Sequence, residues 1–366
     1  MREYTNSEKC LIFLDNFLGL EYKHKIQIVD MIDGDLSLEE FVKKACKYIL
    51  QFVGEKEYST IKASANKEYM QFLLDNLGKR AIKVTTLLSK DYPKCLRQIN
   101  CPPIVIYYKG NLSLASDENF AIVGSRKSLP LSIDLTKQYS KALIDAGFTL
   151  VTGCAEAVDS TVIISALNNG GKIISVVAGG FDNIYPKTNL NLIEKVAVHD
   201  NGLVISEHPP QIKPLPFHFP IRNRIIAGLA KGVLIVSGGL KSGTLYTAEY
   251  AEEFSRDVFA IPYSVGVMSG AGCNELIKKG ALLTDTPQDI LNFYNKTKKN
   301  NKIELSESEK QIVSVLKDGQ LHIEKICNLL NKQVFEITPL LSILEIKGLI
   351  VKSGNVYGLT RNDLEG

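Results

Sequence analysis

Glycine and cationic residues follow several short apolar runs that have the composition of buried β-strands. The cations of these segments are Arg126, Arg222, Arg224 and Lys241. Glycine lets backbone N–H groups approach a ligand closely, and the N-terminus of a following helix favours an anion. The pattern therefore indicates a phosphate-binding rim built from loops far apart in the sequence. The candidate segments are Gly124–Arg126, Thr152–Asp159, Gly179–Pro186, Glu207–Pro210, His218–Arg224 and Ser237–Thr244.

Two common nucleotide-binding motifs are absent from these segments. Gly124 stands alone after the first predicted strand, where a dinucleotide site would have G-x-G-x-x-G. Gly171–Lys172 is followed by Ile173, where a Walker motif needs Ser or Thr. A mononucleotide remains a candidate ligand, but a polyanionic nucleic-acid backbone better matches cations that are spread over several loops.

Aromatic residues next to the arginines point to a single strand. Phe217 and Phe219 lie in the same segment as Arg222 and Arg224. Unpaired bases stack on such rings, with about 1–3 kcal/mol for each stack. Because the bases of a duplex are already stacked on one another, the combination favours single-stranded over double-stranded nucleic acid.

The sequence offers less support for catalysis. The five histidines have no metal-ligand spacing, and no Ser–His–Asp or Cys–His arrangement is evident. Asp159, Asp182 and Glu207 follow predicted strands and have the chemistry of a general acid or base. Carboxylates at helix starts more commonly cap the helix or pair with arginine. We therefore predict no catalytic residue, no metal site and no cofactor.

An alternating βα pattern supplies the scaffold that would bring these segments together. Continuous apolar runs, which are typical of strands covered on both faces, alternate with helical patterns from residue 120 onward. We predict an α/β fold with a doubly wound, Rossmann-like parallel sheet, in which ligands bind at the carboxyl ends of the strands. The predicted strands are 120–123, 148–151, 172–178, 203–206, 233–236, 258–261 and 281–284, and the predicted helices are 131–146, 158–168, 189–198, 221–230, 244–254 and 274–279.

Four regions are expected along the chain. We predict an N-terminal helical module over residues 1–80. We predict that residues 81–294 form the Rossmann-like domain, with a strand-rich lead-in around 104–108. Residues 295–302 contain no apolar side chain and predict a linker. Residues 303–366 predict three helices and a hairpin, the plan of a C-terminal winged-helix-like domain. Its third helix carries Glu336, Glu345 and Lys347 but no arginine, so protein interaction and DNA binding both stay open.

The composition of the chain limits the classes of protein to which it can belong. The 366 residues leave room for two or three domains, and 45% hydrophobic with 23% charged residues excludes a disordered chain. Forty-three basic against 40 acidic residues give a net charge of +3, so any binding charge must be local. No apolar run approaches the roughly 20 residues of a membrane helix. The start of the chain is too polar for a signal peptide, and the seven cysteines form no C-x-x-C pair. We expect a cytoplasmic protein.

Several of these motifs resemble the bacterial DNA-processing protein A family (DprA, also called Smf). The motifs span about 88–285, and the segment His218–Gly228 is the most specific of them. Residues 340–357 are also similar to the small C-terminal domain of the family. The matching motifs are Gly124–Arg126, Gly180–Pro186, His218–Gly228, Ser242–Ala248, Tyr92–Asn111 and Gly272–Gly280.

The resemblance implies a non-enzymatic protein that binds single-stranded DNA in natural transformation and homologous recombination. Members of the family protect incoming strands, load a RecA-type recombinase and form homodimers through the Rossmann domain. Many also carry a helical N-terminal module, which here is the SAM-like region 1–80. The predicted DNA-binding residues are Gly124, Ser125, Arg126, Phe219, Arg222, Asn223, Arg224, Lys241, Ser242 and Gly243.

This sequence departs from the family pattern at three positions. Ala157 stands where the family has glycine, and Ser237 stands where an acidic residue is common. The histidine that the family has a few residues after Ala157 is missing, and Ser160–Ile163 stand there. Alanine adopts positive φ less readily than glycine, so the loop before Val158 is expected to differ in shape.

An enzyme is the alternative interpretation. Ser237–Thr244 followed by Glu249 faintly resembles the Gly-Gly-x-Gly-Thr…Glu stretch of nucleotide phosphoribohydrolases, which cleave an N-glycosidic bond with a Glu beside an Arg. Leu240 and Lys241 interrupt that spacing. A sensor of a small nucleotide would use the same pocket.

Overall fold

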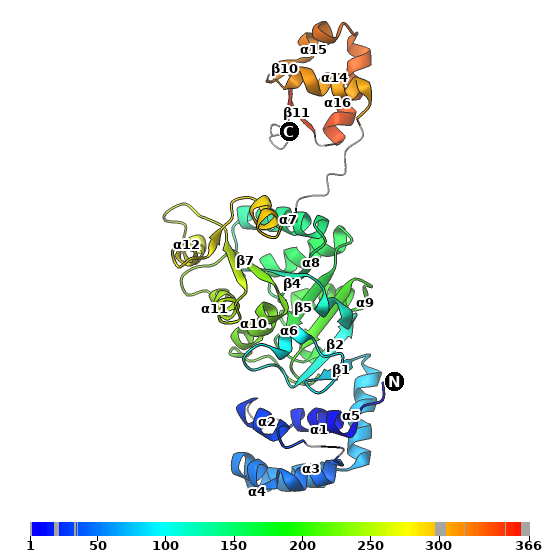
Figure 1. Ribbon diagram of the computed structural model, residues 1–366, viewed down its shortest axis with the longest axis vertical. Helices are drawn as coiled ribbons and strands as arrows, with labels where there is room; N and C mark the ends of the chain where they lie inside the picture. Colours follow the sequence, from blue (N-terminus) through cyan, green and yellow to red (C-terminus); the bar gives the residue numbers. More distant parts are fainter. Residues whose placement is uncertain are drawn as a thin grey trace. The chain divides into compact units, whose positions relative to one another are not determined.

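The computed structural model describes residues 2–17, 22–32, 34, 36–296, 305–317, 319–347 and 349–359. The chain divides into two compact units, Met1–Thr297 and Lys298–Gly366 (Figure 1). Most of the predicted linker, at 297–302, lies outside the described residues.

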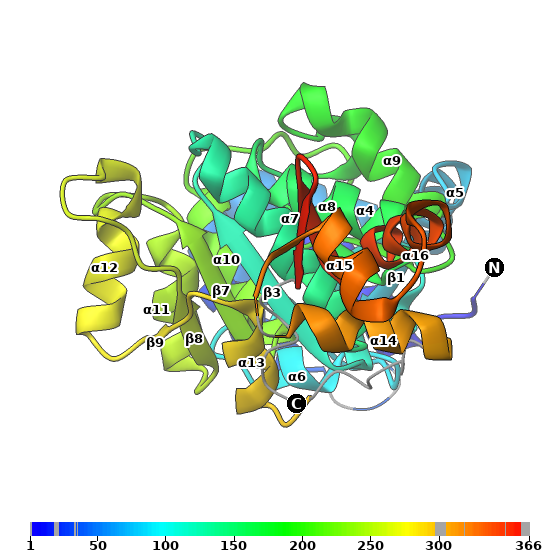
Figure 2. The same cartoon turned by 90° about the horizontal axis from the view of Figure 1, so that it is seen from above.

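A nine-stranded sheet is the centre of the first unit. Its strands follow the order β1-β2-β6-β5-β4-β3-β7-β8-β9, and Figure 2 shows them running across the molecule from β1 to β9. The seven strands from β6 to β9 pair in parallel, which confirms the predicted Rossmann-like sheet. The strands are β1 Lys83–Thr86, β2 Val105–Gly110, β3 Asn119–Gly124, β4 Thr149–Thr152, β5 Ile173–Val177, β6 Gly202–Ser206, β7 Gly232–Ser237, β8 Asp257–Ala260 and β9 Leu282–Leu283.

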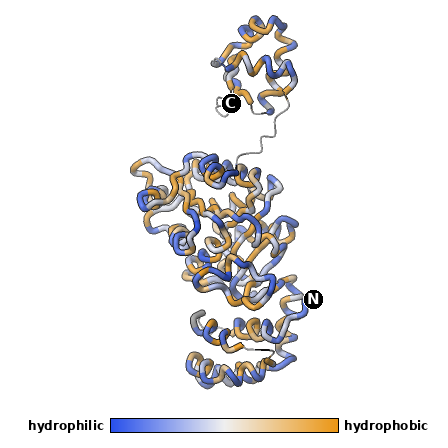
Figure 3. Tube along the Cα trace, viewed as in Figure 1, coloured by the Kyte–Doolittle hydropathy of each residue, from blue (hydrophilic) through white to orange (hydrophobic). Residues whose placement is uncertain are grey.

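Helices cover both faces of this sheet. Alternate residues of one strand enter different cores: Ala121 and Val123 pack under α10, α11 and α12, whereas Phe120 and Ile122 pack under α7, α8 and α9. Apolar residues accordingly gather in the strands and on the inward helix faces (Figure 3). The helices are α6 Lys94–Arg97, α7 Pro130–Asp145, α8 Val158–Asn168, α9 Leu190–Val198, α10 His218–Leu229, α11 Leu245–Glu253, α12 Ala271–Lys278 and α13 Pro287–Phe293, with short 3-10 turns η1 Leu112–Ser116, η2 Phe181–Asn183, η3 Lys187–Asn189 and η4 Met268–Gly270.

The strand order reverses between β3 and β7. The chain passes from β3 through β4 and β5 to β6 in one direction and then returns to place β7 on the other side of β3. Loops that leave the carboxyl ends of β3 and β7 therefore diverge, and a crevice opens between them, as in other doubly wound sheets. This is where the sequence placed Gly124–Arg126 and Ser237–Thr244.

The lead-in differs from a purely parallel sheet. β2 pairs antiparallel with β6, and β1 pairs antiparallel with β2. The sequence predicted a strand near 104–108 but not β1, which is four residues long and has three buried side chains. A run of only four residues could not be distinguished, in the sequence, from the end of the helical pattern that precedes it.

The N-terminal helices pack on this antiparallel edge. They share one hydrophobic cluster with β1 and β2, in which Phe13 and Ile49 lie with Val84 and Tyr107. The Tyr107 hydroxyl donates a 3.0 Å hydrogen bond to Asp15. The all-helical character expected for this region is confirmed, although the apolar pattern of residues 36–52 predicts one helix where the structure has two. The helices are α1 Asn6–Asp15, α2 Tyr22–Val29, α3 Leu38–Lys44, α4 Cys46–Ser64 and α5 Lys67–Lys79.

In its described residues, 305–317, 319–347 and 349–359, the second unit has three helices and a three-stranded antiparallel sheet in the order β10-β12-β11. Its core is formed by side chains such as Ile312, Ile337 and Tyr357. The three predicted helices and the hairpin are present, while the winged-helix-like assignment stays a prediction. Asp318 and Gly348 lie outside the described residues. The elements are α14 Glu307–Leu316, β10 Leu321–His322, α15 Ile323–Leu330, α16 Val334–Ile346, β11 Ile350–Ser353 and β12 Val356–Leu359.

The described residues contain neither a membrane-spanning helix nor a cluster of metal ligands. None of their helices combines the length and apolar character that a membrane span requires. Within the same residues, no three His, Cys, Asp or Glu side chains are grouped so that they could hold a metal ion.

Candidate nucleic-acid interface

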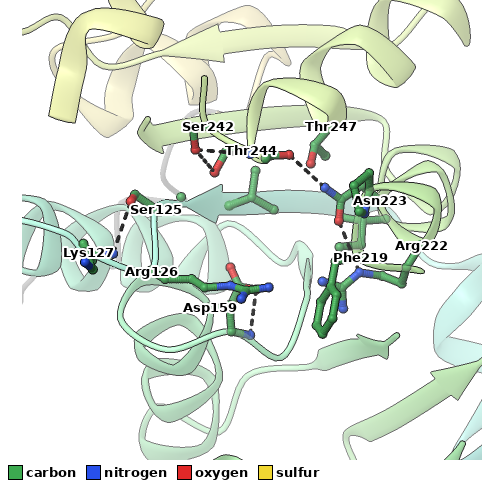
Figure 4. A pocket seen from close by; sticks show the side chains of 16 residues that line it. Ser125, Arg126, Lys127, Asp159, Phe219, Arg222, Asn223, Ser242, Thr244 and Thr247 are labelled. Carbon is green, nitrogen blue, oxygen red and sulfur yellow. Dashed lines mark hydrogen bonds between the residues drawn. The ribbon is translucent and has the colours of Figure 1, made fainter. Parts of the chain in front are cut away.

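A cavity of about 360 Å³ opens at the point where the strand order reverses (Figure 4). Eight of the ten predicted binding residues line it, so the fold brings together loops that are more than a hundred residues apart. Arg224 and Lys241 are not among the lining residues. The eight are Gly124, Ser125, Arg126, Phe219, Arg222, Asn223, Ser242 and Gly243.

The loop after β3 carries the exposed cations of the cavity. Arg126 and Lys127 both line it and both are exposed. Lys127 was missed by the sequence prediction, although it is the next residue after the Gly-Ser-Arg triplet. Figure 4 shows Arg126, from the loop after β3, and Phe219, from the start of α10, pointing toward one another, and the guanidinium carbon lies 4.7 Å from the ring centroid. A cation and an aromatic ring therefore share the mouth of the cavity.

Ser237, one of the three departures from the family pattern, supports this loop. Its carbonyl oxygen accepts a 3.0 Å hydrogen bond from the Ser125 backbone N–H, and its hydroxyl lies 2.9 Å from the Ser128 hydroxyl. Ser237 is fully buried at the end of β7. A hydroxyl here ties the loop after β3 to the neighbouring strand without adding a negative charge under Arg126.

Arg222 forms the floor of the cavity rather than its mouth. Its side chain is 7% exposed, and its Nη1 donates to the backbone carbonyl oxygen of Val176. Burial lowers the pKa of Arg222, and the nearby Asp159 opposes that shift. Burial likewise raises the pKa of Asp159, with Arg222 opposing. A Cβ at Gly153 would collide with both side chains, which explains the glycine at that position.

Arg224 forms an ion pair outside the cavity lining. It is 5% exposed, and its Nη1 lies 2.9 Å from Glu207 Oε2, while Nη2 makes a second contact with Oε1. Its Nε donates to the Cys101 carbonyl oxygen at 3.0 Å. Burial opposes ionisation of Glu207, but the Arg224 guanidinium overcomes it and lowers the pKa of that carboxyl. The structure thus gives Arg224 a role in folding.

The start of α11 contributes polar groups to the opposite wall. Ser242, Gly243 and Thr244 line the cavity, and the Thr244 N–H donates to the Ser242 hydroxyl at 3.3 Å. Asn223 reaches across from α10 and donates to the Gly243 carbonyl oxygen at 3.2 Å. Because backbone N–H groups at a helix start favour an anion, this wall suits a phosphate. Lys241 is exposed in the same loop, one residue outside the lining.

The carboxylates take the supporting roles that the sequence favoured. Asp159 accepts a 3.0 Å hydrogen bond from the Ala155 N–H, Asp182 pairs with Arg80 at 3.1 Å, and Glu207 holds Arg224. Glu249, the residue on which the enzyme alternative depends, is exposed on α11 and does not line the cavity. Among the described residues that line the cavity, Asp159 is the only one with a carboxylate.

Ala157 keeps a glycine-like backbone. It has φ 65° and ψ −105° immediately before α8, so the loop retains a conformation that costs an L-residue about 1–3 kcal/mol. We expect Ala157→Gly to raise the free energy of unfolding by about 1 kcal/mol, since relief of strain exceeds the added flexibility of the unfolded chain. Urea denaturation measures this change. Ala155→Gly, in the same loop, is the control and should not stabilise the protein; an Ala157→Gly variant less stable than the parent would contradict the strained geometry.

Comparison with known proteins decides the family. The model of the DNA recombination-mediator protein A family matches residues 83–295, which include every segment that lines the cavity. The chain belongs to this family. A DNA processing protein DprA of Bacillus subtilis (strain 168) is 38% identical over 238 residues, which are 63% of this chain and 80% of the relative. The DprA of Streptococcus pneumoniae (strain ATCC BAA-255 / R6) is 40% identical over 206 residues, 56% of this chain and 72% of the relative.

Solved structures of the family share this fold. The X-ray structure of DNA processing protein A from Streptococcus pneumoniae superposes with a TM-score of 0.65 at 32% identity and covers 80% of this chain and 98% of its own. A structure of the protein from Helicobacter pylori, described for its single-stranded DNA binding mode, gives a TM-score of 0.53 at 30% identity, with 58% of this chain and 96% of its own covered. The family assigned from the sequence motifs is confirmed.

Proposed function

We propose that the cavity between β3 and β7 binds the sugar–phosphate backbone of single-stranded DNA. The observation that carries the proposal is the meeting of exposed Arg126 and Lys127 with the Phe219 ring and the start of α11 in one cavity. Cations and helix N–H groups suit phosphates, and the ring suits an unstacked base. The single-stranded DNA binding mode described for the Helicobacter pylori relative supports this choice of ligand.

A single strand suits the cavity better than a duplex. The ring and the cations lie within one recess of about 360 Å³, where a nucleotide can place its base and phosphate together. In a duplex the bases are paired inside the helix, so only phosphates would meet the recess. The experiment is a fluorescence anisotropy titration with a labelled oligonucleotide, single-stranded and then annealed to its complement. Tighter binding of the single strand supports the proposal, and a preference for the duplex would refute it.

We further propose that the protein binds DNA without altering it covalently. The carboxylate within the cavity, Asp159, is buried and hydrogen-bonded, and Glu249 lies outside. The phosphoribohydrolase alternative requires release of free base from nucleoside monophosphates. Turnover that Glu249→Gln abolishes would establish that alternative in place of ours.

Protection of incoming strands and loading of a RecA-type recombinase in transformation are the finer parts of the proposal. Membership of the recombination-mediator family supports them. The assay is the rate at which a RecA-type recombinase forms filaments on a single strand already covered by single-strand-binding protein. The proposal predicts a faster rate with this protein present, and an unchanged rate would refute the loading role.

A homodimer through the Rossmann domain is also proposed. β9 is the edge strand of the sheet, and its two apolar side chains are exposed, Leu282 to 37% and Leu283 to 52%. Exposed apolar groups beside an unpaired strand edge are typical of an interface. We expect Leu283→Asp to weaken the dimer at least about 10-fold in analytical ultracentrifugation. Phe72→Asp, an equally drastic change at an exposed residue of α5, is the control; a monomeric parent protein would contradict the proposal.

A further inference from the structure

An exposed tyrosine stands beside the cavity without lining it. Tyr185 follows η2 in the loop after β5 and is 52% exposed. Its ring meets that of Phe219 edge to face, with centroids 5.8 Å apart and planes at 72°. Arg126, Phe219 and Tyr185 therefore form a continuous line of contacts from the mouth of the cavity outward.

Phe219 can offer a base only one face of its ring. One face of its ring carries the Arg126 guanidinium, and the residue as a whole is only partly exposed. The sequence favoured Phe219 as a stacking platform, but the neighbouring Tyr185 offers the larger open aromatic surface. Phe217, the other predicted platform, is 57% exposed, but its ring packs against the His218 ring, with the centroids 4.5 Å apart.

The loop that carries Tyr185 is fixed on several sides. The Asp182 N–H donates to the Pro210 carbonyl oxygen at 2.9 Å, and Asn183 Nδ2 donates to the Gln211 carbonyl oxygen at 3.0 Å. Arg80 of the N-terminal region pairs with Asp182, and Ile184 is buried. A loop held in this way loses little conformational freedom when a base stacks on Tyr185, which favours binding.

We propose that Tyr185 is a base-stacking residue of the DNA site. A nucleobase of the strand stacks on its ring while the phosphate backbone passes Arg126. This inference rests on the proposed function, because it names a second contact of the same strand. The ligand class is any exposed nucleobase, since every base presents an aromatic face and stacking is tolerant of sequence.

The experiment compares Tyr185→Ala with Tyr185→Phe, using a single-stranded oligonucleotide and an abasic strand of equal length. Loss of one stack is expected to weaken binding of the normal strand about 5- to 100-fold for Tyr185→Ala. Tyr185→Phe should bind like the parent, because the ring remains. The abasic strand should bind both variants and the parent equally. Tyr48→Ala, at a similarly exposed tyrosine of α4, is the matched control and should change nothing.

The outcomes separate this inference from the proposed function. If Arg126→Ala loses affinity while Tyr185→Ala binds like the parent, the stacking role is refuted and the proposed function stands. If Phe217→Ala weakens binding of the single strand and Tyr185→Ala does not, the stacking role of Tyr185 is refuted as well. If the parent protein binds no single strand, both proposals fall. Quenching of 2-aminopurine in the strand by the parent but not by Tyr185→Ala gives an independent readout that does not depend on affinity.

Discussion

Arg126→Ala should weaken binding of single-stranded DNA about 10- to 100-fold while leaving the fold intact. The side chain is exposed at the mouth of the cavity, and its one described aromatic contact is with Phe219. A charge-assisted hydrogen bond to a phosphate contributes about 1.5–3 kcal/mol, which sets the size of the effect. Removing one phosphate contact should also reduce the slope of log K against log salt by about 0.7. Anisotropy titrations at several salt concentrations measure both quantities.

Lys137→Ala is the control for charge alone. Lys137 lies on α7, outside the cavity lining, with its side chain 60% exposed. Its removal lowers the net charge by the same amount but should leave affinity and salt slope nearly unchanged. Equal losses for the two variants would mean that binding follows overall charge and not the cavity. A normal melting temperature for Arg126→Ala completes the comparison.

Arg224→Ala should destabilise the protein by about 3–5 kcal/mol. Removing one partner of a buried ion pair leaves the other charge unpaired and desolvated, and here Glu207 would be left in that state. The hydrogen bond to the Cys101 carbonyl oxygen would be lost as well. The expected fall in melting temperature is on the order of 10 °C. Calorimetry or chemical denaturation measures the change, and Glu207→Ala should have an effect of similar size.

The double variant Arg224→Met with Glu207→Leu distinguishes an ion pair from a DNA contact. With both charges gone, well-packed apolar side chains should recover a large part of the lost stability. This variant should still bind single-stranded DNA, because neither residue lines the cavity. A stable double variant that has lost DNA binding would show that Arg224 contacts the strand, as the sequence alone suggested.

The neighbouring arginines of α10 show how much of the site could be predicted from the sequence. Arg222 and Arg224 are two residues apart, and in a helix that places them on opposite sides. One therefore forms the floor of the cavity and the other pairs with Glu207. Motif and spacing predicted that this segment belongs to the site, and Arg222 but not Arg224 lies in the cavity lining. The predicted helix 221–230 contains both residues, so their opposite directions follow from the sequence, whereas the pairing of Arg224 with Glu207 depends on the fold.

Other differences have similar local causes. The parallel sheet follows directly from long apolar runs such as 172–178, whereas β1 has only four residues and depends on pairing with β2. Ser237 gave no sign of its role, because its bonds to Ser125 and Ser128 depend on β3 and β7 being neighbours. Tyr185 could be noted in its motif, but only its contact with Phe219 suggests a purpose. Long-range neighbours, which sequence patterns do not specify, account for these cases.

The salt dependence of single-stranded DNA binding tests the central claim most directly. Each phosphate neutralised in a single strand contributes about −0.7 to the slope of log K against log salt. With Arg126 and Lys127 both exposed in the cavity, we expect tight binding at low salt and a slope of about −1.4 or steeper. We also expect the single strand to bind more tightly than its duplex at every salt concentration. Absence of binding at low salt, or a slope near zero, would contradict the account.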